Sequence, residues 1–560
     1  MRLTSVASAV ALGAAVAAAK ELPKDERLGF EVYDSGAKMD EIMAIKLEHW
    51  QAELAAGAWN SSQWPRLGYT KCVNGVAEAI KGDPLNTFRC KNVDLYDFIN
   101  HATLGSPMGQ TDGSTGSSTW GWTDPKSGRE FIASGMYQGT AFIEILPIGK
   151  MLHVGFLPCP APLGQNALWK EIRPYKNYIL IGSELVGHGI QIFDMTKLLS
   201  IDARKGPHTF STSDVTGHFT DLPLGRTHNV VINQELGYGV AVGAAPRTDA
   251  CRAGLIFFDL TNPSKPTRLG CDGQDGYVHD AQCLVYRGPD TRYQGRDICY
   301  GYNEDTLTIY DVTNKTKPTI ISRTSYEGAS YTHQGWVLDV NNQEYLLLDD
   351  EYDEYDVVGP GTDGYPVTYI WDIRNLQSPK NTGLYKGTTR AIDHNQYVID
   401  GLSYQSNYMA GLRVYDVSSV PADPTGGGVC EIAFFDIFPE DDSEPGGGAV
   451  EFSGTWASYA YFKSGFIFVN TIERGAFLVK MTKREKCKAK SCNADNCLRA
   501  LRSETNLAAS QQFCGGFTKT YVVDVAVVPA YAQKVCTTNI ISRVSSACSC
   551  LPAAATAAAP

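Results

Sequence analysis

The stretch Gly411-Leu412-Arg413-Val414-Tyr415-Asp416 is a short apolar strand that ends in an aspartate, and its pattern recurs along the chain. In each copy two strand-like runs come before the stretch and a turn, often with proline, comes after it. The clearest other copies are 189–194, 254–259, 307–311 and 367–372, and two weaker copies are 139–144 and 475–480. Units of four short strands at periods of about 40–60 residues are typical of a β-propeller. We therefore predict an all-β, seven-bladed β-propeller over residues 119–483.

An array of β-sandwich domains is the alternative to the propeller. It would need linkers between domains, and the turns between these units are too short and too regular for linkers. The aspartates at the ends of the third strands are expected to be structural, because a short acidic side chain there can accept hydrogen bonds from turn amides. They are Asp194, Asp259, Asp311, Asp372 and Asp416.

The net charge and the first residues of the chain limit which binding partners and which cellular compartment are expected. The net charge is −12 and no basic block stands out, which argues against a nucleic-acid partner. Residues 1–19 combine Arg2, an apolar run and Ala17-Ala18-Ala19, which indicates a secretory signal peptide. This run is too short to span a bilayer, and no later run is long enough. We expect a protein without a membrane span, monomeric and secreted to the extracellular space or cell wall, with glycosylation sequons at Asn60 and Asn314.

The fifteen cysteines fit an oxidising compartment. We predict the pairs Cys72–Cys90, Cys251–Cys271 and Cys283–Cys299, and the odd total leaves one thiol free or joined to another molecule. Residues 20–118 are predicted to form an N-terminal extension with a helix from residue 39 to 56. Residues 484–551 form a cysteine-rich module in which disulfides are favoured over zinc. The Ala/Pro tail, 552–560, is expected to be disordered.

Four of the ten histidines lie at matching places, each just ahead of an apolar strand. They are His228, His279, His333 and His394, and they are 51, 54 and 61 residues apart. The first strand of a propeller blade lines the central channel. Equivalent positions in neighbouring blades should therefore meet around one axis.

Carboxylates should reach the same mouth of the channel. The second strand of a blade runs antiparallel to the first, so its end lies beside the start of the first strand. Glu184, Glu304 and Glu351 follow three such strand ends. They are our candidates for the groups that orient the imidazoles or act as a general base.

The histidine cluster has two interpretations, which the sequence leaves open. Three or four converging imidazoles suit a divalent transition metal such as Fe, Cu, Zn or Mn. Alternatively, each histidine satisfies a buried carbonyl, and the repetition reflects only blade duplication. Blades one, two and seven place Trp122, Trp169 and Trp456 near comparable positions, so the position tolerates other residues. The acidic run 349–354 offers oxygen ligands for calcium but lacks the glycine and the spacing of an EF-hand, so we interpret it as a solvated loop.

Four motifs carry a resemblance to a known family: residues 276–282, 286–290, 331–336 and 392–395. They look like motifs of the choice-of-anchor B family, secreted proteins with LVIVD-type propeller repeats, and the stretch at 411–416 resembles the LVIVD unit. The resemblance covers about residues 68–483 and is strongest to fungal secreted members, some labelled "regulatory P domain-containing". It implies a propeller and a surface or extracellular location, but supplies no activity for any residue. The cysteine module replaces the anchoring signals of bacterial members, which puts cell-surface anchoring in doubt.

Two functions follow from these observations. The first is an extracellular scaffold that recognises a protein, glycan or cell-wall ligand through loops on a stiff frame. The second is a metal-dependent hydrolase or oxidoreductase with its site at the channel mouth. The fold alone does not decide between these two functions. The sequence contains no nucleophile elbow and no phosphate-binding loop that would add a third.

Overall fold

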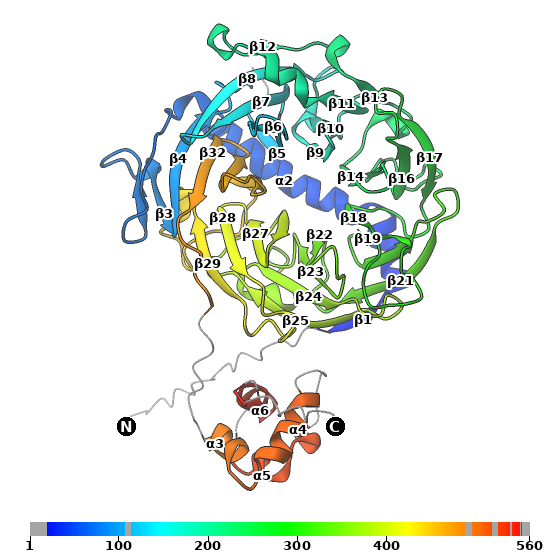
Figure 1. Cartoon of the computed structure of the whole chain (residues 1–560), viewed down its shortest axis with the longest axis vertical. Coiled ribbons are helices and arrows are strands. Elements are labelled where there is room, and N and C mark those ends of the chain that lie inside the picture. Colours follow the sequence, from blue (N-terminus) through cyan, green and yellow to red (C-terminus); the bar gives the residue numbers. More distant parts are fainter. Residues whose placement is uncertain are drawn as a thin grey trace, which may run out of the picture.

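The computed structural model describes residues 20–106, 114–487, 496–517, 525–537, 540–548 and 550–551. Seven mainly antiparallel sheets are arranged around one axis as the blades of a β-propeller (Figure 1), which confirms the predicted fold. The innermost strands of neighbouring blades contact each other around the axis. The predicted signal peptide, residues 1–19, and the predicted tail, 552–560, lie outside the described residues.

The first four blades follow each other in the sequence. Blade one has β5 (Gly116–Thr123), β6 (Glu130–Met136), β7 (Gly139–Leu146) and β8 (Lys150–Pro158), and β12 (His208–Thr209) joins its edge. Blade two has β9 (Lys170–Tyr175), β10 (Tyr178–Ser183), β11 (Ile190–Asp194) and β13 (Gly217–Phe219). Blade three has β14 (Asn229–Asn233), β15 (Tyr238–Val242), β16 (Leu255–Asp259) and β17 (Thr267–Asp272). Blade four has β18 (Asp280–Val285), β19 (Asp297–Tyr302), β20 (Leu307–Asp311) and β21 (Thr319–Tyr326), and β1 (Glu21–Pro23) pairs with β21.

The last three blades complete the ring. Blade five has β22 (Thr332–Val337), β23 (Tyr345–Asp350), β24 (Val367–Asp372) and β25 (Lys380–Lys386). Blade six has β26 (Gln396–Ile399), β27 (Leu402–Ser406), β28 (Leu412–Asp416) and β29 (Cys430–Phe435), extended by β3 (Thr87–Lys91) and β2 (Val76–Glu78). Blade seven has β30 (Thr455–Tyr459), β31 (Phe466–Thr471), β32 (Gly475–Met481) and β4 (Val93–Asn100).

The last blade corrects the expected start of the propeller at residue 119. Its outermost strand is β4, which comes from the segment that we assigned to the N-terminal extension. β4 pairs antiparallel with β32, from Gly475 opposite Asn100 to Met481 opposite Val93. Both strands are largely buried, so this pairing closes the ring with hydrogen bonds and with apolar contacts. An early strand thus completes the last blade.

The third strands and their aspartates confirm the repeat. In β16, Leu255 to Phe258 are fully buried because the strand is covered on both faces by neighbouring blades. Asp259 ends β16 and accepts a hydrogen bond from the backbone of Thr261, at 2.8 Å. Asp194, Asp311, Asp372 and Asp416 each accept the same bond from the residue two positions on. These aspartates fix the turns, as expected.

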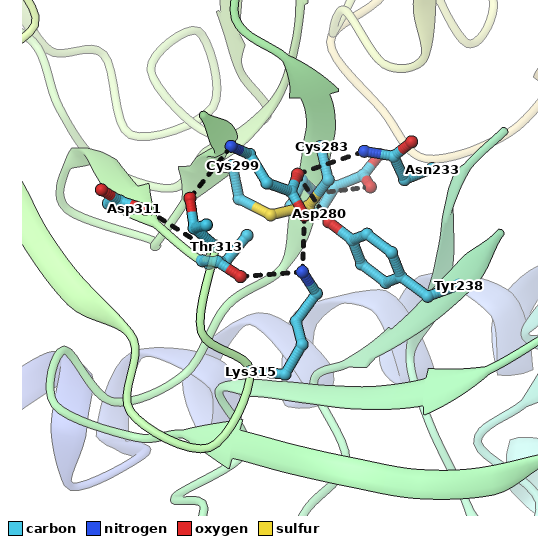
Figure 2. The surroundings of a disulfide bond; sticks show 11 residues. Asn233, Tyr238, Asp280, Cys283, Cys299, Asp311, Thr313 and Lys315 are labelled. Atoms are coloured by element: carbon cyan, nitrogen blue, oxygen red, sulfur yellow. Dashed lines mark hydrogen bonds and ion pairs between the residues drawn. A yellow bond between two sulfur atoms is a disulfide. The ribbon is translucent and has the colours of Figure 1, made fainter. Parts of the chain in front are cut away.

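The disulfides confirm the three predicted pairs: Cys72–Cys90, Cys251–Cys271 and Cys283–Cys299. Cys283–Cys299 joins β18 to β19, and Figure 2 shows it beside Lys315, Tyr238 and Asn233 of the surrounding network. Cys487, which we assigned to the C-terminal module, instead pairs with Cys430 of blade six. Cys159 is the one free thiol among the described residues.

Helices occur before and after the propeller. The N-terminal segment contains α1 (Glu26–Leu28), a π-helical turn (Gly29–Asp34) and α2 (Ala37–Ala56), which confirms the helix expected from residue 39. The C-terminal module contains α3 (Asn496–Arg502), α4 (Leu507–Phe517), α5 (Ala530–Gln533) and α6 (Ile540–Cys548). Cys497–Cys536 and Cys514–Cys548 cross-link it around its own small core. No helix in the described parts of the chain is both long enough and apolar enough to cross a bilayer.

Candidate functional site

The four repeated histidines form one continuous row at the hub of the propeller. Ring centroids are 4.2 Å apart between His228 and His279, 4.3 Å between His279 and His333, and 4.5 Å between His333 and His394. The row spans blades three to six. Three of the four residues are almost completely buried, and the side chain of His228 is 12% exposed. The predicted convergence of these imidazoles is therefore observed.

The start of each innermost strand places its histidine. His228 and His279 directly precede β14 and β18, and His394 lies two residues before β26. His333 lies inside β22 at a bulge, where Thr332 pairs with Asp350 and Gln334 pairs with Asp349. A bulge leaves one residue unpaired and redirects its side chain. The bulge thus keeps His333 in the row although its strand begins one residue earlier.

Backbone carbonyls fix the proton on two of the rings. Nδ1 of His279 donates to the carbonyl of His333 at 2.8 Å, and Nδ1 of His394 donates to the carbonyl of Trp456 at 2.7 Å. A carbonyl oxygen only accepts, so both rings carry their proton on Nδ1 and keep a lone pair on Nε2. Burial lowers the pKa of both histidines well below the usual value. Both rings are therefore neutral and have the tautomer of a metal ligand.

His333 contacts a carboxylate rather than a carbonyl. Its Nδ1 lies 3.0 Å from Oδ1 of Asp349. Asp349 also accepts from the backbone of Gln334 at 2.9 Å and from the side chain of Gln396 at 3.0 Å. Burial raises the pKa of Asp349 and lowers that of His333 to about 4. A carboxylate on one ring nitrogen is the arrangement that orients metal-binding histidines in other proteins.

His228, at the end of the row, forms an ion pair with Glu184. Burial opposes a charge on this ring, but the hydrogen bond and the negative charge of Glu184 outweigh burial and raise the pKa of His228. The same bond lowers the pKa of Glu184 against the opposing effect of burial. The Glu184 carboxylate thus favours the protonated form of His228, beside three neutral imidazoles.

His333, His394 and Glu351 form the tightest set of potential ligands. One donor atom from each lies within 4.8 Å of the other two, and no other trio of histidine, cysteine or acidic side chains does so in the described residues. Nε2 of His394 is 3.8 Å from Oε1 of Glu351. Ligands of a tetrahedral zinc ion lie about 3.3 Å apart, so the three side chains need to close by at most about 1.5 Å. Two imidazoles and one carboxylate suit Zn²⁺ or Fe²⁺.

Helix α2 lies across the hub (Figure 1) and reaches the site with a lysine. Nζ of Lys46 donates to Oε1 of Glu351 at 2.6 Å, and both side chains are buried. Burial alone would raise the pKa of Glu351, but the charge and the hydrogen bond of the Lys46 ammonium outweigh it and lower this pKa to about 2. Trp50 of α2 donates to the carbonyl of Phe452 at 2.8 Å and packs against Trp169.

Lys46 was not among the residues predicted from the sequence, although its position in the helix indicates a buried partner. Ile42, Lys46 and Trp50 are spaced by four residues, so they share the buried face of the helix. A lysine between two buried apolar residues on one helical face needs a buried partner. Asp349 was also missed as a partner for His333, because it precedes the end of β23 by one residue.

Glu304 does not join the cluster. Its carboxylate forms an ion pair with Arg247, with the closest atoms 2.6 Å apart, and Arg247 stacks over the ring of Tyr277. Glu304 also has a left-handed backbone, with φ of 62°. Among the three candidate carboxylates, Glu184 and Glu351 therefore lie at the histidine row, and Glu304 is held beside it by an arginine.

Two other expectations need correction. Trp169 and Trp456 do lie beside the hub, but Trp122 lies near the far end of β5 against Phe131. The acidic run 349–354 is buried rather than solvated. Asp350 in this run accepts from the hydroxyl of Tyr326 and from three backbone amides, so it anchors the loop beside blade five.

Comparison with known proteins adds little to this geometry. No protein-family model and no curated protein matches the chain. Among solved structures, the computationally designed Ika8 protein aligns with 74% of this chain and 96% of its own, at 10% identity and a TM-score of 0.37. A likeness this distant says nothing about the function of the hub.

Proposed function

We propose that this chain is an extracellular β-propeller that binds a divalent transition metal ion at its hub through His333, His394 and Glu351. The observation that carries the proposal is the state of His394. Its Nδ1 is tied to the carbonyl of Trp456, its pKa is far below the usual value because it is buried, and its Nε2 faces Glu351. A neutral imidazole with its free nitrogen beside an ionised carboxylate is the donor set of Zn²⁺ and Fe²⁺ sites.

The remaining groups at the hub suit supporting roles. Asp349 is placed to hold the ring of His333 in position, and the carbonyl of His333 holds His279. A bound metal would polarise a substrate oxygen or activate water, which is the chemistry of a hydrolase or an oxidoreductase. The Glu184–His228 pair, further along the row, supplies a carboxylate and an imidazole that can exchange a proton.

Recognition of an extracellular protein, glycan or cell-wall ligand is the second candidate. One observation favours it: α2 covers the mouth of the hub and Lys46 neutralises Glu351, so a substrate has no direct path to the histidines from this side. The resemblance to the choice-of-anchor B family and six disulfides among the described cysteines support an extracellular location for either function.

Metal content tests the proposal directly. The full chain should be made through a secretory pathway, stripped with a chelator, and titrated with Zn²⁺, Fe²⁺ or Mn²⁺, with bound metal measured by elemental analysis. We expect about one metal ion per chain, lost in His394→Ala and in Glu351→Gln. His208→Ala is the matched control, because His208 is exposed at the edge of blade one. If neither the wild type nor a variant that lacks the Lys46 ammonium beside Glu351 binds metal, recognition remains as the function.

A further inference from the structure

We infer that Lys46 is a built-in competitor for the metal and that α2 controls whether the hub is loaded. The inference rests on the proposed metal site and adds a rule for its occupation. The ammonium of Lys46 occupies the place beside Glu351 that the metal would take. Metal and lysine therefore exclude each other, and the hub binds metal when α2 withdraws its lysine.

The first step concerns one carboxylate oxygen of Glu351, which already accepts two hydrogen bonds. Oε1 of Glu351 accepts from Nζ of Lys46 at 2.6 Å and from the hydroxyl of Tyr408. The same oxygen lies 3.8 Å from Nε2 of His394. The carboxylate oxygen closest to the free imidazole nitrogen is thus already engaged by one full positive charge.

The second step is the burial of this ion pair. Lys46 is 6% exposed and Glu351 1% exposed, so water screens neither charge. An ammonium and a divalent cation at one buried oxygen would repel each other strongly. The rings of Phe452 and Tyr352, with centroids 5.1 and 5.6 Å from Nζ, add cation–π attraction that favours the ammonium. The hub therefore holds either the Lys46 ammonium or the metal ion, but not both. When α2 is docked, the cation in the hub is the ammonium.

The third step is the way in which α2 is held. The helix begins after Gly36 and ends before Gly57, and both glycines have left-handed backbones, with φ of 88° and 81°. A Cβ at Gly57 would meet nothing within 4 Å, so glycine there serves the backbone conformation and not packing. Such residues can absorb the rotation of a rigid element between them.

The polar anchors of α2 are few. Apart from Lys46, they are the pair of Lys38 with Asp356 at 2.6 Å and the bonds of His49 and Trp50 to Ser453 and Phe452, each at 2.8 Å. In addition, Nδ1 of His49 lies 3.4 Å from Glu451, and the hydroxyl of Tyr331 donates to Sδ of Met39 at 3.7 Å. Among these polar contacts, that of Lys46 alone reaches a candidate metal ligand, Glu351. Without the Lys46 contact, α2 would still be held by these bonds and by the buried side chains of Ile42 and Trp50, so the lysine can leave Glu351 while the helix stays docked as a lid.

Variants at position 46 test the inference with Zn²⁺ alone as the probe. Lys46→Met keeps the length of the side chain and removes the charge, so Glu351 loses its counter-ion. We expect this variant to bind Zn²⁺ at least tenfold more tightly than the wild type, by calorimetric titration of the full chain. Lys46→Arg keeps a cation and should bind like the wild type. Lys265→Met removes one positive charge from an exposed turn of blade three, so it should also leave the affinity unchanged.

A second measurement separates the lid from simple charge repulsion. Zn²⁺ should accelerate hydrogen exchange in α2 of the wild type, because the metal expels Lys46, whereas Lys46→Met should show no further acceleration. Thermal unfolding of each variant confirms that it is folded, and Lys46→Gln replaces Lys46→Met if the latter is not.

The outcomes are distinguishable. Equal Zn²⁺ affinity in the wild type and Lys46→Met overturns the inference but leaves the metal site in place, provided that His394→Ala abolishes binding. A gain in Lys265→Met equal to that in Lys46→Met also overturns it, because the effect would then be general electrostatics. No binding in any variant overturns both the proposed function and the inference.

Discussion

His333 and Asp349 face each other at the hub, with Nδ1 of the ring 3.0 Å from Oδ1 of the carboxylate. This contact orients the imidazole and makes its Nε2 a stronger donor. We predict that Asp349→Asn lowers the affinity for Zn²⁺ by about 10–100-fold, the usual cost of losing such a partner. Calorimetric titration measures it. Asp400→Asn is the control, because Asp400 is exposed on a turn; an equal loss there would refute the role of Asp349.

Glu304→Gln should separate the salt bridge from the metal site. Its carboxylate pairs with Arg247 and not with a histidine, so we expect metal binding to be unchanged. Stability should fall by about 2 kcal/mol, because a buried hydrogen bond to a charged group is lost. Chemical denaturation and metal titration of the same sample give both values. A loss of metal as large as that in Glu351→Gln would show that Glu304 belongs to the site.

Phe98→Ala should weaken the closure of the ring. Phe98 of β4 is 1% exposed and packs against Phe477 of β32, with ring centroids 4.5 Å apart. We expect a loss of about 3–5 kcal/mol of stability, since truncation of a buried phenylalanine leaves a cavity. Phe30→Ala is the comparison, because Phe30 is 70% exposed and should cost less than about 0.5 kcal/mol. Equal denaturation midpoints for the two variants would contradict a closing role for β4.

The Cys430–Cys487 disulfide should stabilise the propeller rather than the C-terminal module. It joins blade six to the chain just after β32 and encloses a sequence separation of 57 residues. In the chain-entropy model its removal in Cys430→Ala/Cys487→Ala costs about 4 kcal/mol. Cys497→Ala/Cys536→Ala, inside the module, should leave the main unfolding transition unchanged. Calorimetry of both double variants decides the matter, and the reverse pattern would place Cys487 with the module.

Acid should destabilise the fold through buried neutral histidines, with His101 as the clearest case. Burial lowers the pKa of His101 to about 4, and its Nε2 donates to the carbonyl of Thr471. The unfolded chain, with a pKa near 6.5, binds the proton first. Stability is therefore fully present above pH 6.5 and is lost as the pH falls towards 4, by about 3 kcal/mol for this residue.

His101→Gln should reduce that slope. Glutamine can still donate to Thr471 but does not titrate, so the fall in unfolding free energy between pH 6.5 and 4 should shrink. His208→Gln, at an exposed position, should retain the wild-type slope. The same slope in all three proteins would mean that His101 is not protonated on unfolding.

The sequence predicted the blades because each one repeats a local pattern. Leu255 to Asp259 shows it: four apolar residues and a turn-capping aspartate define a strand without knowledge of its neighbours. β4 could not be assigned in the same way. Its own residues indicate a strand, but its partner β32 lies about 375 residues later, and no local rule selects that pairing.

The histidine row was predictable for the same reason, since strand direction and repetition fix which end of each blade carries His279 or His333. The distance of each carboxylate from the axis was not predictable. Glu304 was therefore expected to contact the histidines, whereas its carboxylate pairs with Arg247. The location of Lys46 depends on how α2 docks, and docking follows from the combined aromatic surface of several blades. The burial of Asp353 and Glu354 was missed because charged runs are normally solvated.

The place of β4 has a consequence for biosynthesis. The ribosome makes this strand early, yet β32 emerges only about 375 residues later. At translation rates of about 5–20 residues per second, β4 waits roughly 20 to 75 s without its partner. Val93–Asn100 is then an unpaired strand with exposed apolar side chains, and such a strand is prone to pair wrongly. Folding factors that shield nascent chains should therefore bind this segment before the ring closes.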